Sequence, residues 1–311
     1  NDAVVTEDFD QILGHTKKMI QKPHQINDGS MIKIGLGPCL PFASQEKDYE
    51  QTAILARKYK GVILQTHCAE SIWEVAYTRK KFGLTPVGLM EKSGFIGPDV
   101  SLTHGNVVSE SEVKLLGKSK TNVVVTPVCN TRDAADGNRI APVSQLLSCG
   151  ANISLGTDGP ASNDSLNFLE ELRHFRVVSR AKEGLAWGNP DKQEKYSYLT
   201  PLQTLQIANL GGSKTLNRPD IGIIEEGKVA DLAIFDPNTE ISHAGAVNKW
   251  AALLSCQAIK PKYLLVDGKT IINNYQLTTI NLEKLNKTFR KIHKGVITRA
   301  QKHLKLNLVD Y

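Results

Sequence analysis

The chain has 311 residues, 41% of them hydrophobic and 23% charged, with a formal net charge of +6. These values are ordinary for a soluble globular protein and exclude extended disorder. No apolar run approaches the roughly 20 residues that cross a bilayer, so we expect no membrane partner. Five cysteines without a CxxC pair argue against a disulfide framework and a thiolate zinc site, and they favour a cytoplasmic protein.

One stretch concentrates positive charge, between residues 284 and 305. Its apolar residues recur at helical spacing, at Leu285, Phe289, Ile292 and Val296. The pattern predicts an amphipathic surface helix with a solvated basic face rather than a nucleic-acid-binding patch. We therefore expect no nucleic-acid partner.

Residues 30–160 alternate between apolar runs and segments with helical spacing. The apolar runs predict strands over 31–35, 62–64, 100–102, 122–126 and 153–155. Helices are predicted over 45–60, 75–82, 86–92, 143–148 and 166–182, with one more headed by the capping-box pair Ser109 and Glu112. Continuous apolar strands with helices between them indicate a parallel sheet that is buried on both faces. No GxGxxG motif joins a strand to a helix, which disfavours a dinucleotide-binding fold.

The pattern of predicted elements changes after residue 200. A helix is predicted over 200–215, followed by short strands and tight turns in 221–236. Residues 263–272 read as a hairpin with an Asp267-Gly268 turn. We therefore predict three parts: a barrel segment over 1–219, a small β-subdomain over 220–275 and a C-terminal amphipathic helix over 276–311.

Ionisable side chains follow three of the predicted strands. His67 and Glu70 follow the strand at 62–64, His104 follows the next strand, and Asp158 stands between Gly156 and Gly159 after the last one. A single histidine after a strand is commonly structural, and Asp-Gly is commonly a turn. However, the carboxyl ends of parallel strands meet at one edge of a sheet, so these groups are expected to converge on one pocket.

Five segments resemble the amidohydrolase superfamily, in the branch of cytosine, 8-oxoguanine and S-adenosylhomocysteine deaminases and triazine hydrolases. They are THCAES (66–71), SLTHGN (101–106), PVCNTRDAADGNRIAPV (127–143), LGTDGPASNDSLNFLEELR (155–173) and DIGIIEEGKVADLAIFD (220–236). The resemblance implies a TIM-type (β/α)8 barrel, with strands 4–8 in this chain, and a small β-sandwich subdomain.

The resemblance also implies roles for the four strand-end residues. His67 and Asp158, with His104 beside them, would hold one divalent metal ion, zinc in the first place and iron otherwise. Glu70 would carry a proton from the attacking water to a ring nitrogen of the substrate. His104 would polarise the forming tetrahedral centre or orient the water, and Asp158 would deliver a proton to the leaving group.

This sequence departs from the family pattern in two places. The family's first barrel strand ends in a His-x-His pair, and no such pair occurs here. The resemblance therefore implies a chain without the first three barrel strands. Residues 126–129 read Thr-Pro-Val-Cys, where relatives often carry His-Cys-Pro-Ser-Ser, in a loop that shapes substrate choice.

The leading hypothesis is a hydrolytic deaminase acting on a small aminated heterocycle such as a purine, pterin or triazine-like ring. The segment GLGPCLPFA at 35–43 leans towards the 8-oxoguanine deaminase and hydroxyatrazine hydrolase group. Two alternatives stay open: a catalytically silent fragment, and a hydrolase that releases chloride or an alkylamine. Metal content separates the silent fragment from the others. Unpaired strand edges also lead us to expect a homo-oligomer.

Overall fold

A computed structural model describes residues 8–22, 24, 29–136, 139–163, 165–186, 199–236, 248–255 and 260–304. The chain divides into two compact units, which are considered separately. The first comprises Asn1–Val229 and Ser242–Cys256, and the second comprises Ala230–Ile241 and Gln257–Tyr311. The three-part boundaries drawn from the sequence stay a prediction.

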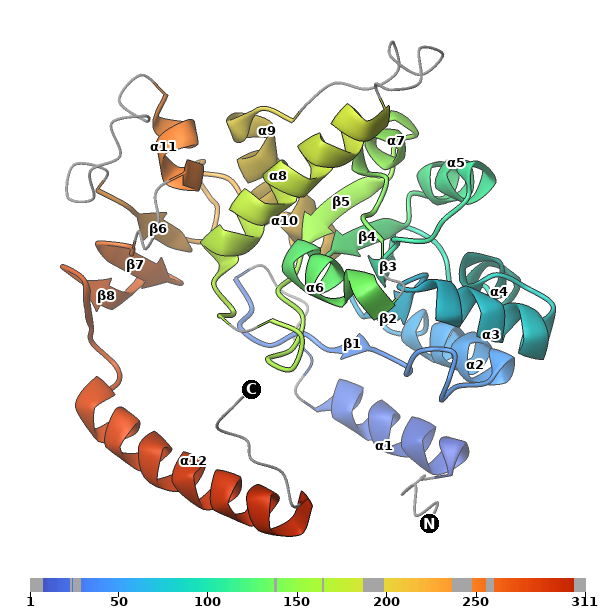
Figure 1. Ribbon diagram of the computed structural model, residues 1–311, viewed down its shortest axis with the longest axis horizontal. Helices are drawn as coiled ribbons and strands as arrows, with labels where there is room; N and C mark the ends of the chain where they lie inside the picture. Colours follow the sequence, from blue (N-terminus) through green and yellow to red (C-terminus); the bar gives the residue numbers. More distant parts are fainter. Residues whose placement is uncertain are drawn as a thin grey trace. The chain divides into compact units, whose positions relative to one another are not determined.

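A parallel sheet of five described strands forms the centre of the first unit, and the strands lie side by side in chain order (Figure 1). They are β1 (Gly35–Leu36), β2 (Ile63–Cys68), β3 (Val100–His104), β4 (Asn122–Val125) and β5 (Asn152–Leu155). Every residue of β3 is buried, as expected for a central strand covered on both faces. The predicted parallel sheet is therefore confirmed.

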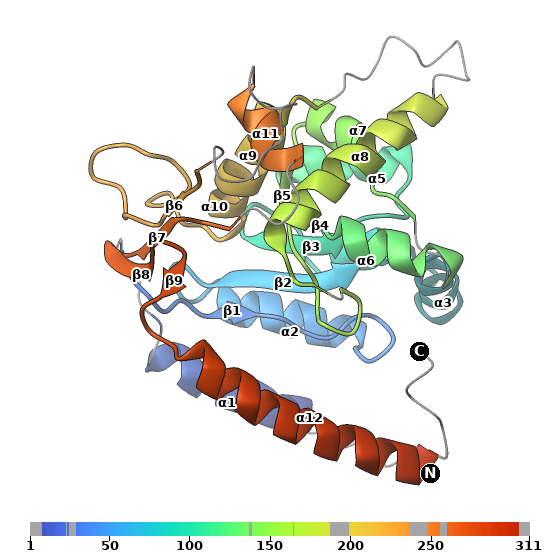
Figure 2. The ribbon, with the colours of Figure 1, turned by 60° about the vertical axis from the view of Figure 1, so that its left-hand side comes forward.

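Helices connect consecutive strands, and the described ones before residue 187 are α1 (Phe9–Gln21), α2 (Glu46–Ala56), α3 (Ile72–Phe82), α4 (Pro86–Lys92), α5 (Glu110–Ser119), α6 (Pro127–Arg132), α7 (Val143–Ser148) and α8 (Phe168–Ala186). The predicted capping box of Ser109 and Glu112 forms at the start of α5, and the side chain of Ser71 caps α3. Figure 2 shows α2 beside β1 and β2, whereas α10 lies beside β5. Apolar side chains of these helices and the strands form one core cluster.

The first strand begins later than predicted. Its described pairing covers Gly35 and Leu36 rather than residues 31–35. The cause is a side chain, because the backbone N–H of Ile34 donates to Nδ1 of His24 at 2.9 Å. That donor is therefore unavailable to a neighbouring strand.

The helix predicted over 200–215 forms, but its middle is a π-helical segment. α9 (Pro201–Gln206) continues through Ile207–Gly211 into α10 (Gly212–Thr215). The backbone of Gly211 lies directly against β5, where a Cβ at this position would be 2.0 Å from the carbonyl oxygen of Ile153. Asn152 also donates to the carbonyl oxygen of Gly211 at 3.0 Å. Contact with the sheet thus accounts for the irregular turn. α11 (Lys249–Ser255) completes the described helices of this unit.

The described strands of the second unit form one small antiparallel sheet: β6 (Leu232–Ile234), β7 (Tyr263–Val266), β8 (Lys269–Asn273) and β9 (Gln276–Leu277). The predicted hairpin is confirmed, since Asp267 and Gly268 join β7 to β8 with φ of 50° and 72°. Between 221 and 236 only β6 forms, so the prediction of several short strands there was wrong.

The predicted C-terminal helix is α12 (Leu282–Leu304), and its apolar residues Leu285, Phe289, Ile292 and Val296 are exposed. In the part of the chain that the structure describes, no helix combines the length and apolarity needed to span a membrane.

Candidate active site

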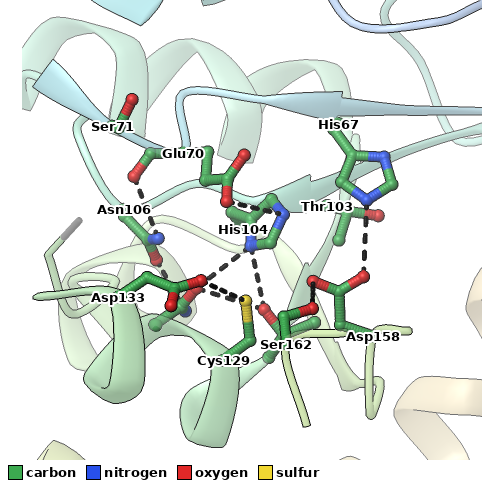
Figure 3. A network of polar contacts seen from close by, with 12 residues as sticks. His67, Glu70, Ser71, Thr103, His104, Asn106, Cys129, Asp133, Asp158 and Ser162 are labelled. Carbon is green, nitrogen blue, oxygen red and sulfur yellow. Dashed lines mark hydrogen bonds and ion pairs between the residues drawn. The ribbon is translucent and has the colours of Figure 1, made fainter. Parts of the chain in front are cut away.

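The carboxyl ends of β2, β3 and β5 bring all four strand-end residues together (Figure 3). His67 is the penultimate residue of β2, Glu70 follows that strand, and His104 ends β3. Asp158 lies three residues beyond β5. Nε2 of His67 lies 3.7 Å from Oδ1 of Asp158, and Nε2 of His104 lies 3.8 Å from Oε1 of Glu70. The two imidazole rings have centroids 5.0 Å apart.

The backbone is left-handed at the points where the chain leaves these strands. Ala69, His104 and Asp158 have φ of 56°, 80° and 58°. Residues other than glycine adopt this conformation at a cost of about 1–3 kcal/mol, and such strain is concentrated at functional sites. Two of the three strained residues, His104 and Asp158, are site residues themselves, and Ala69 directly precedes Glu70.

His104 presents an unpartnered nitrogen to the site. The side chain is 0% exposed, and among the described residues its Nε2 has no hydrogen-bond partner. Burial lowers the pKa of this imidazole, which is therefore neutral near pH 7. Burying a polar atom without a partner lowers stability by about 1–3 kcal/mol, which indicates that a ligand binds at this nitrogen.

Asp158 and His67 form an ion pair on the more open side of the site. The Asp158 carboxylate raises the pKa of His67, and His67 holds the pKa of Asp158 well below its usual range. Asp158 also accepts hydrogen bonds from the backbone N–H of Gly159 at 2.8 Å and from Oγ of Ser162 at 3.1 Å. The carboxylate is therefore charged and fixed in direction.

These residues fit a metal ion. One ligand atom each from His67, His104 and Asp158 lies within 4.8 Å of the others. Two ligands about 2.1 Å from a tetrahedral zinc ion lie about 3.4 Å apart, which is close to the observed His67–Asp158 separation. The unpartnered Nε2 of His104 supplies the third donor. Imidazole nitrogens with a carboxylate oxygen form a donor set typical of catalytic zinc.

A second group shares His104 and adds Glu70 and Cys129 within the same distance. Cys129 is buried, and burial raises the pKa of its thiol well above the usual range. Its Sγ donates a long hydrogen bond to Asp133 at 3.8 Å. A neutral thiol is a poor metal ligand, so the set with His67 and Asp158 fits better.

Two buried carboxylates brace the loops of the site, and neither was predicted from the sequence. Glu74 on α3 accepts the backbone N–H groups of Ala69 and Glu70 at 3.1 and 2.7 Å. Burial raises the pKa of Glu74. The available signal was a glutamate four residues before Thr78, the other buried residue of α3.

Glu171 on α8 joins α6, the helix after β4, to the loop that follows β5. It accepts from the backbone N–H of Val128 at 3.2 Å and from the side-chain amide of Asn163. The Asn163 amide also donates to the carbonyl oxygen of Thr157. Burial raises the pKa of Glu171 to about 7. Through Asn163, Glu171 thereby links the residue before Asp158 to the first turn of α6.

The remaining described histidines lie outside the site. His174 contacts Oγ1 of Thr131 at 2.7 Å, and His24 contacts the carbonyl oxygen of Lys60 at 2.9 Å. Asn130, which belongs to the segment at 127–143 that carries the family resemblance, contacts Nδ1 of His104 at 3.0 Å. Gly137, in the same segment, lies outside the described residues.

Comparison with curated proteins finds relatives that are deaminases. The chain is 32% identical over 262 residues to 8-oxoguanine deaminase from Pseudomonas aeruginosa, covering 84% of this chain and 55% of the relative. It is 30% identical over 290 residues to 5-methylthioadenosine/S-adenosylhomocysteine deaminase from Thermoanaerobacter pseudethanolicus, covering 92% and 63%. The chain thus spans somewhat more than half the length of these relatives.

Solved structures show the same fold. Zinc-bound atrazine chlorohydrolase from Arthrobacter aurescens TC1 superposes with a TM-score of 0.83 at 26% identity, covering 93% of this chain and 61% of that one. This similarity identifies the parallel sheet and its helices as part of a TIM-barrel fold. The model of the amidohydrolase family matches residues 5–271. The resemblance read from the five sequence segments is therefore confirmed, and the chain belongs to the amidohydrolase family.

Proposed function

We propose that this chain carries part of the active site of a metal-dependent hydrolase that deaminates an aminated nitrogen heterocycle. The observation that carries the proposal is the unpartnered Nε2 of His104, which lies with His67 and Asp158 at the carboxyl ends of parallel strands. The deaminase names of the most similar curated relatives support this reaction class. Since those relatives are longer, the closed eight-stranded barrel and the β-sandwich are part of the same proposal.

His67, His104 and Asp158 would hold one divalent ion. Zinc is favoured by the donor set and by zinc in the similar chlorohydrolase structure, and iron is the alternative. When bound, the ion supplies Lewis acidity that lowers the pKa of a coordinated water towards neutrality.

The chain's own residues then divide the proton transfers. Asp158, kept charged by its low pKa, accepts a proton from the attacking water. His104 is neutral because burial lowers its pKa, and its imidazole beside the reacting carbon would polarise the forming tetrahedral centre. Glu70, whose backbone is held by Glu74, lies on the other side of His104 and carries a proton to the ring nitrogen.

The atoms balance in a simple hydrolysis. Water oxygen adds to the ring carbon that bears the amino group, and the adjacent ring nitrogen takes a proton through Glu70. The bond from that carbon to the amino nitrogen then breaks. Asp158 returns its proton to the departing nitrogen, which leaves as ammonia, and the ring keeps a carbonyl group.

A second candidate is release of chloride instead of ammonia. The structural similarity to an atrazine chlorohydrolase at 26% identity favours it. The same residues would serve, because chloride needs no proton on departure. One assay with both readouts separates the two reactions.

The test is a metal and product measurement on the zinc-loaded chain. Bound zinc is counted after gel filtration, and ammonia and chloride are measured with 8-oxoguanine, 5′-methylthioadenosine and atrazine. We expect about one zinc per chain, ammonia from an aminated purine, and loss of turnover in Asp158→Asn but not in the exposed control Asp10→Asn. Steady turnover by zinc-loaded Asp158→Asn would remove the role of Asp158. A chain that binds no zinc would support the silent fragment.

A further inference from the structure

We propose that Asn130, held in orientation by Asn106, is a positioning residue that fixes the tautomer of His104. In this arrangement Nδ1 carries the hydrogen and Nε2 presents a lone pair to the site. The importance of that lone pair rests on the proposed function, whereas the tautomer follows from a directed chain of hydrogen bonds (Figure 3). The residues involved are buried: Asn106 is 4% exposed, Asn130 is 1% and His104 is 0%.

The backbone carbonyl of Glu70, at the end farthest from His104, sets the direction of these hydrogen bonds. The carbonyl oxygen of Glu70 can only accept, so Asn106 must present Nδ2 to it, at 3.1 Å. Oδ1 of Asn106 then faces Asn130, which must donate through its own Nδ2, at 2.8 Å. This leaves Oδ1 of Asn130 directed at His104.

An amide oxygen can only accept, and this decides the proton on the ring. Oδ1 of Asn130 lies 3.0 Å from Nδ1 of His104, so Nδ1 must be the donor. In a neutral imidazole the other nitrogen is then unprotonated. The carbonyl of Glu70 thus fixes the orientation of two buried amides, and these amides determine that Nε2 of His104 carries the lone pair.

The hydroxyl of Thr126 could donate to Nδ1 of His104 and so favour the opposite tautomer, with hydrogen on Nε2. Asn130 prevents this. Oγ1 of Thr126 lies 2.8 Å from Nδ1 of His104 and 3.1 Å from Oδ1 of Asn130. A hydroxyl has one hydrogen. While it donates to Asn130, its lone pair can share the Nδ1 hydrogen. If it donated to Nδ1 instead, the lone pairs of Nδ1 and Asn130 Oδ1 would face each other.

Removing either neighbour therefore has opposite consequences. In Asn130→Ala, the Thr126 hydroxyl loses its acceptor and donates to Nδ1, which moves the ring hydrogen to Nε2. In Thr126→Val, the amide oxygen still accepts from Nδ1, so the original tautomer stays. Each variant deletes one buried polar group beside His104. A role limited to packing or stability predicts similar effects from both.

The tautomer is measured directly on the metal-free chain with nitrogen-15-labelled histidine. Two-bond proton–nitrogen correlations at mildly alkaline pH distinguish the protonated from the unprotonated ring nitrogen, and His104→Gln assigns the signals. We expect hydrogen on Nδ1 in the unchanged chain and in Thr126→Val, and hydrogen on Nε2 in Asn130→Ala. Asn130→Leu, which keeps the branching at Cγ and the number of side-chain heavy atoms, serves as a second variant if the alanine variant unfolds.

Zinc titration gives the second readout. Loss of an outer partner of a metal-binding histidine weakens metal affinity roughly 10- to 100-fold. We expect a loss of that size for Asn130→Ala and a smaller one for Thr126→Val. Hydrogen on Nε2 in the unchanged chain, or the same tautomer in both variants, would overturn the inference. Because the tautomer measurement needs neither metal nor turnover, a tautomer switch in a chain that binds no zinc would count against the proposed function alone.

Discussion

The carboxylate of Glu74 accepts the backbone N–H of Glu70 at 2.7 Å, and through its other oxygen it accepts the N–H of Ala69. A glutamate on α3 therefore holds the segment that carries the proposed proton carrier. The bond also pairs two backbone donors at the left-handed turn of Ala69.

Replacing Glu74 by glutamine tests this brace. Glutamine has one acceptor oxygen, so one of the two N–H groups is left facing an amide NH2 group. We expect Glu74→Gln to lower the free energy of unfolding by about 1–3 kcal/mol, measured by urea denaturation. The exposed control Glu50→Gln on α2 should stay within about 0.5 kcal/mol. Equal effects of the two variants would contradict the brace.

Glu171 should make stability depend on pH. Its pKa of about 7 in the folded chain lies above the ordinary value, so the folded state holds this proton more tightly than the unfolded state. The corresponding stabilisation is present below about pH 4 and is lost as pH rises through about 7, with a magnitude of roughly 3 kcal/mol.

The measurement compares urea unfolding at about pH 5 and about pH 8. Unfolding free energy of the unchanged chain should fall more steeply between these pH values than that of Glu171→Gln, which cannot ionise. Glu50→Gln is the exposed control, because Glu50 is not among the groups that shift the pKa of Glu171, and it should follow the unchanged chain. Parallel pH profiles for Glu171→Gln and the unchanged chain would remove the assigned titration.

Two adjacent glycines should respond oppositely to alanine. A Cβ on Gly211 would lie 2.0 Å from the carbonyl oxygen of Ile153, whereas a Cβ on Gly212 would meet nothing within 4 Å. Gly211→Ala should destabilise the chain by about 1–3 kcal/mol because the helix must move off β5. Gly212→Ala should be neutral or stabilising by up to about 1 kcal/mol. Thermal or urea unfolding measures both, and similar values would contradict the close approach.

Zinc should stabilise the chain only while its ligands are present. A ligand that binds the folded state alone adds about 2.7 kcal/mol at a free concentration about 100 times its Kd. We expect a stabilisation of that size in the unchanged chain and in the exposed control His15→Asn, and its loss in His67→Asn. Equal stabilisation of all three by zinc would place the ion elsewhere.

The sequence predicts well those features that short stretches encode. Apolar runs predicted the strands of the parallel sheet, and the strand-end positions of His67, His104 and Asp158 predicted their convergence. The capping box of Ser109 and Glu112 was also predicted, because its two residues are close together in the sequence. The assigned catalytic and metal roles stay predictions.

Features that depend on contacts between residues far apart in the sequence could not be predicted. The late start of β1 depends on His24 reaching the backbone of Ile34, and the π-helical segment depends on Gly211 meeting Ile153. Glu74 and Glu171 look like ordinary helical glutamates until the fold buries them. The amide relay to His104 joins residues 70, 106 and 130, which no local pattern connects.

The left-handed backbone at His104 and Asp158 also limits which amino acids these positions tolerate. Asparagine, aspartate, histidine and glycine accept that conformation most readily, and β-branched residues accept it least. A saturation library at either position would therefore be filtered first by backbone geometry and only then by chemistry. Asparagine is the cleanest probe of side-chain function there, while valine or isoleucine would report a distorted turn.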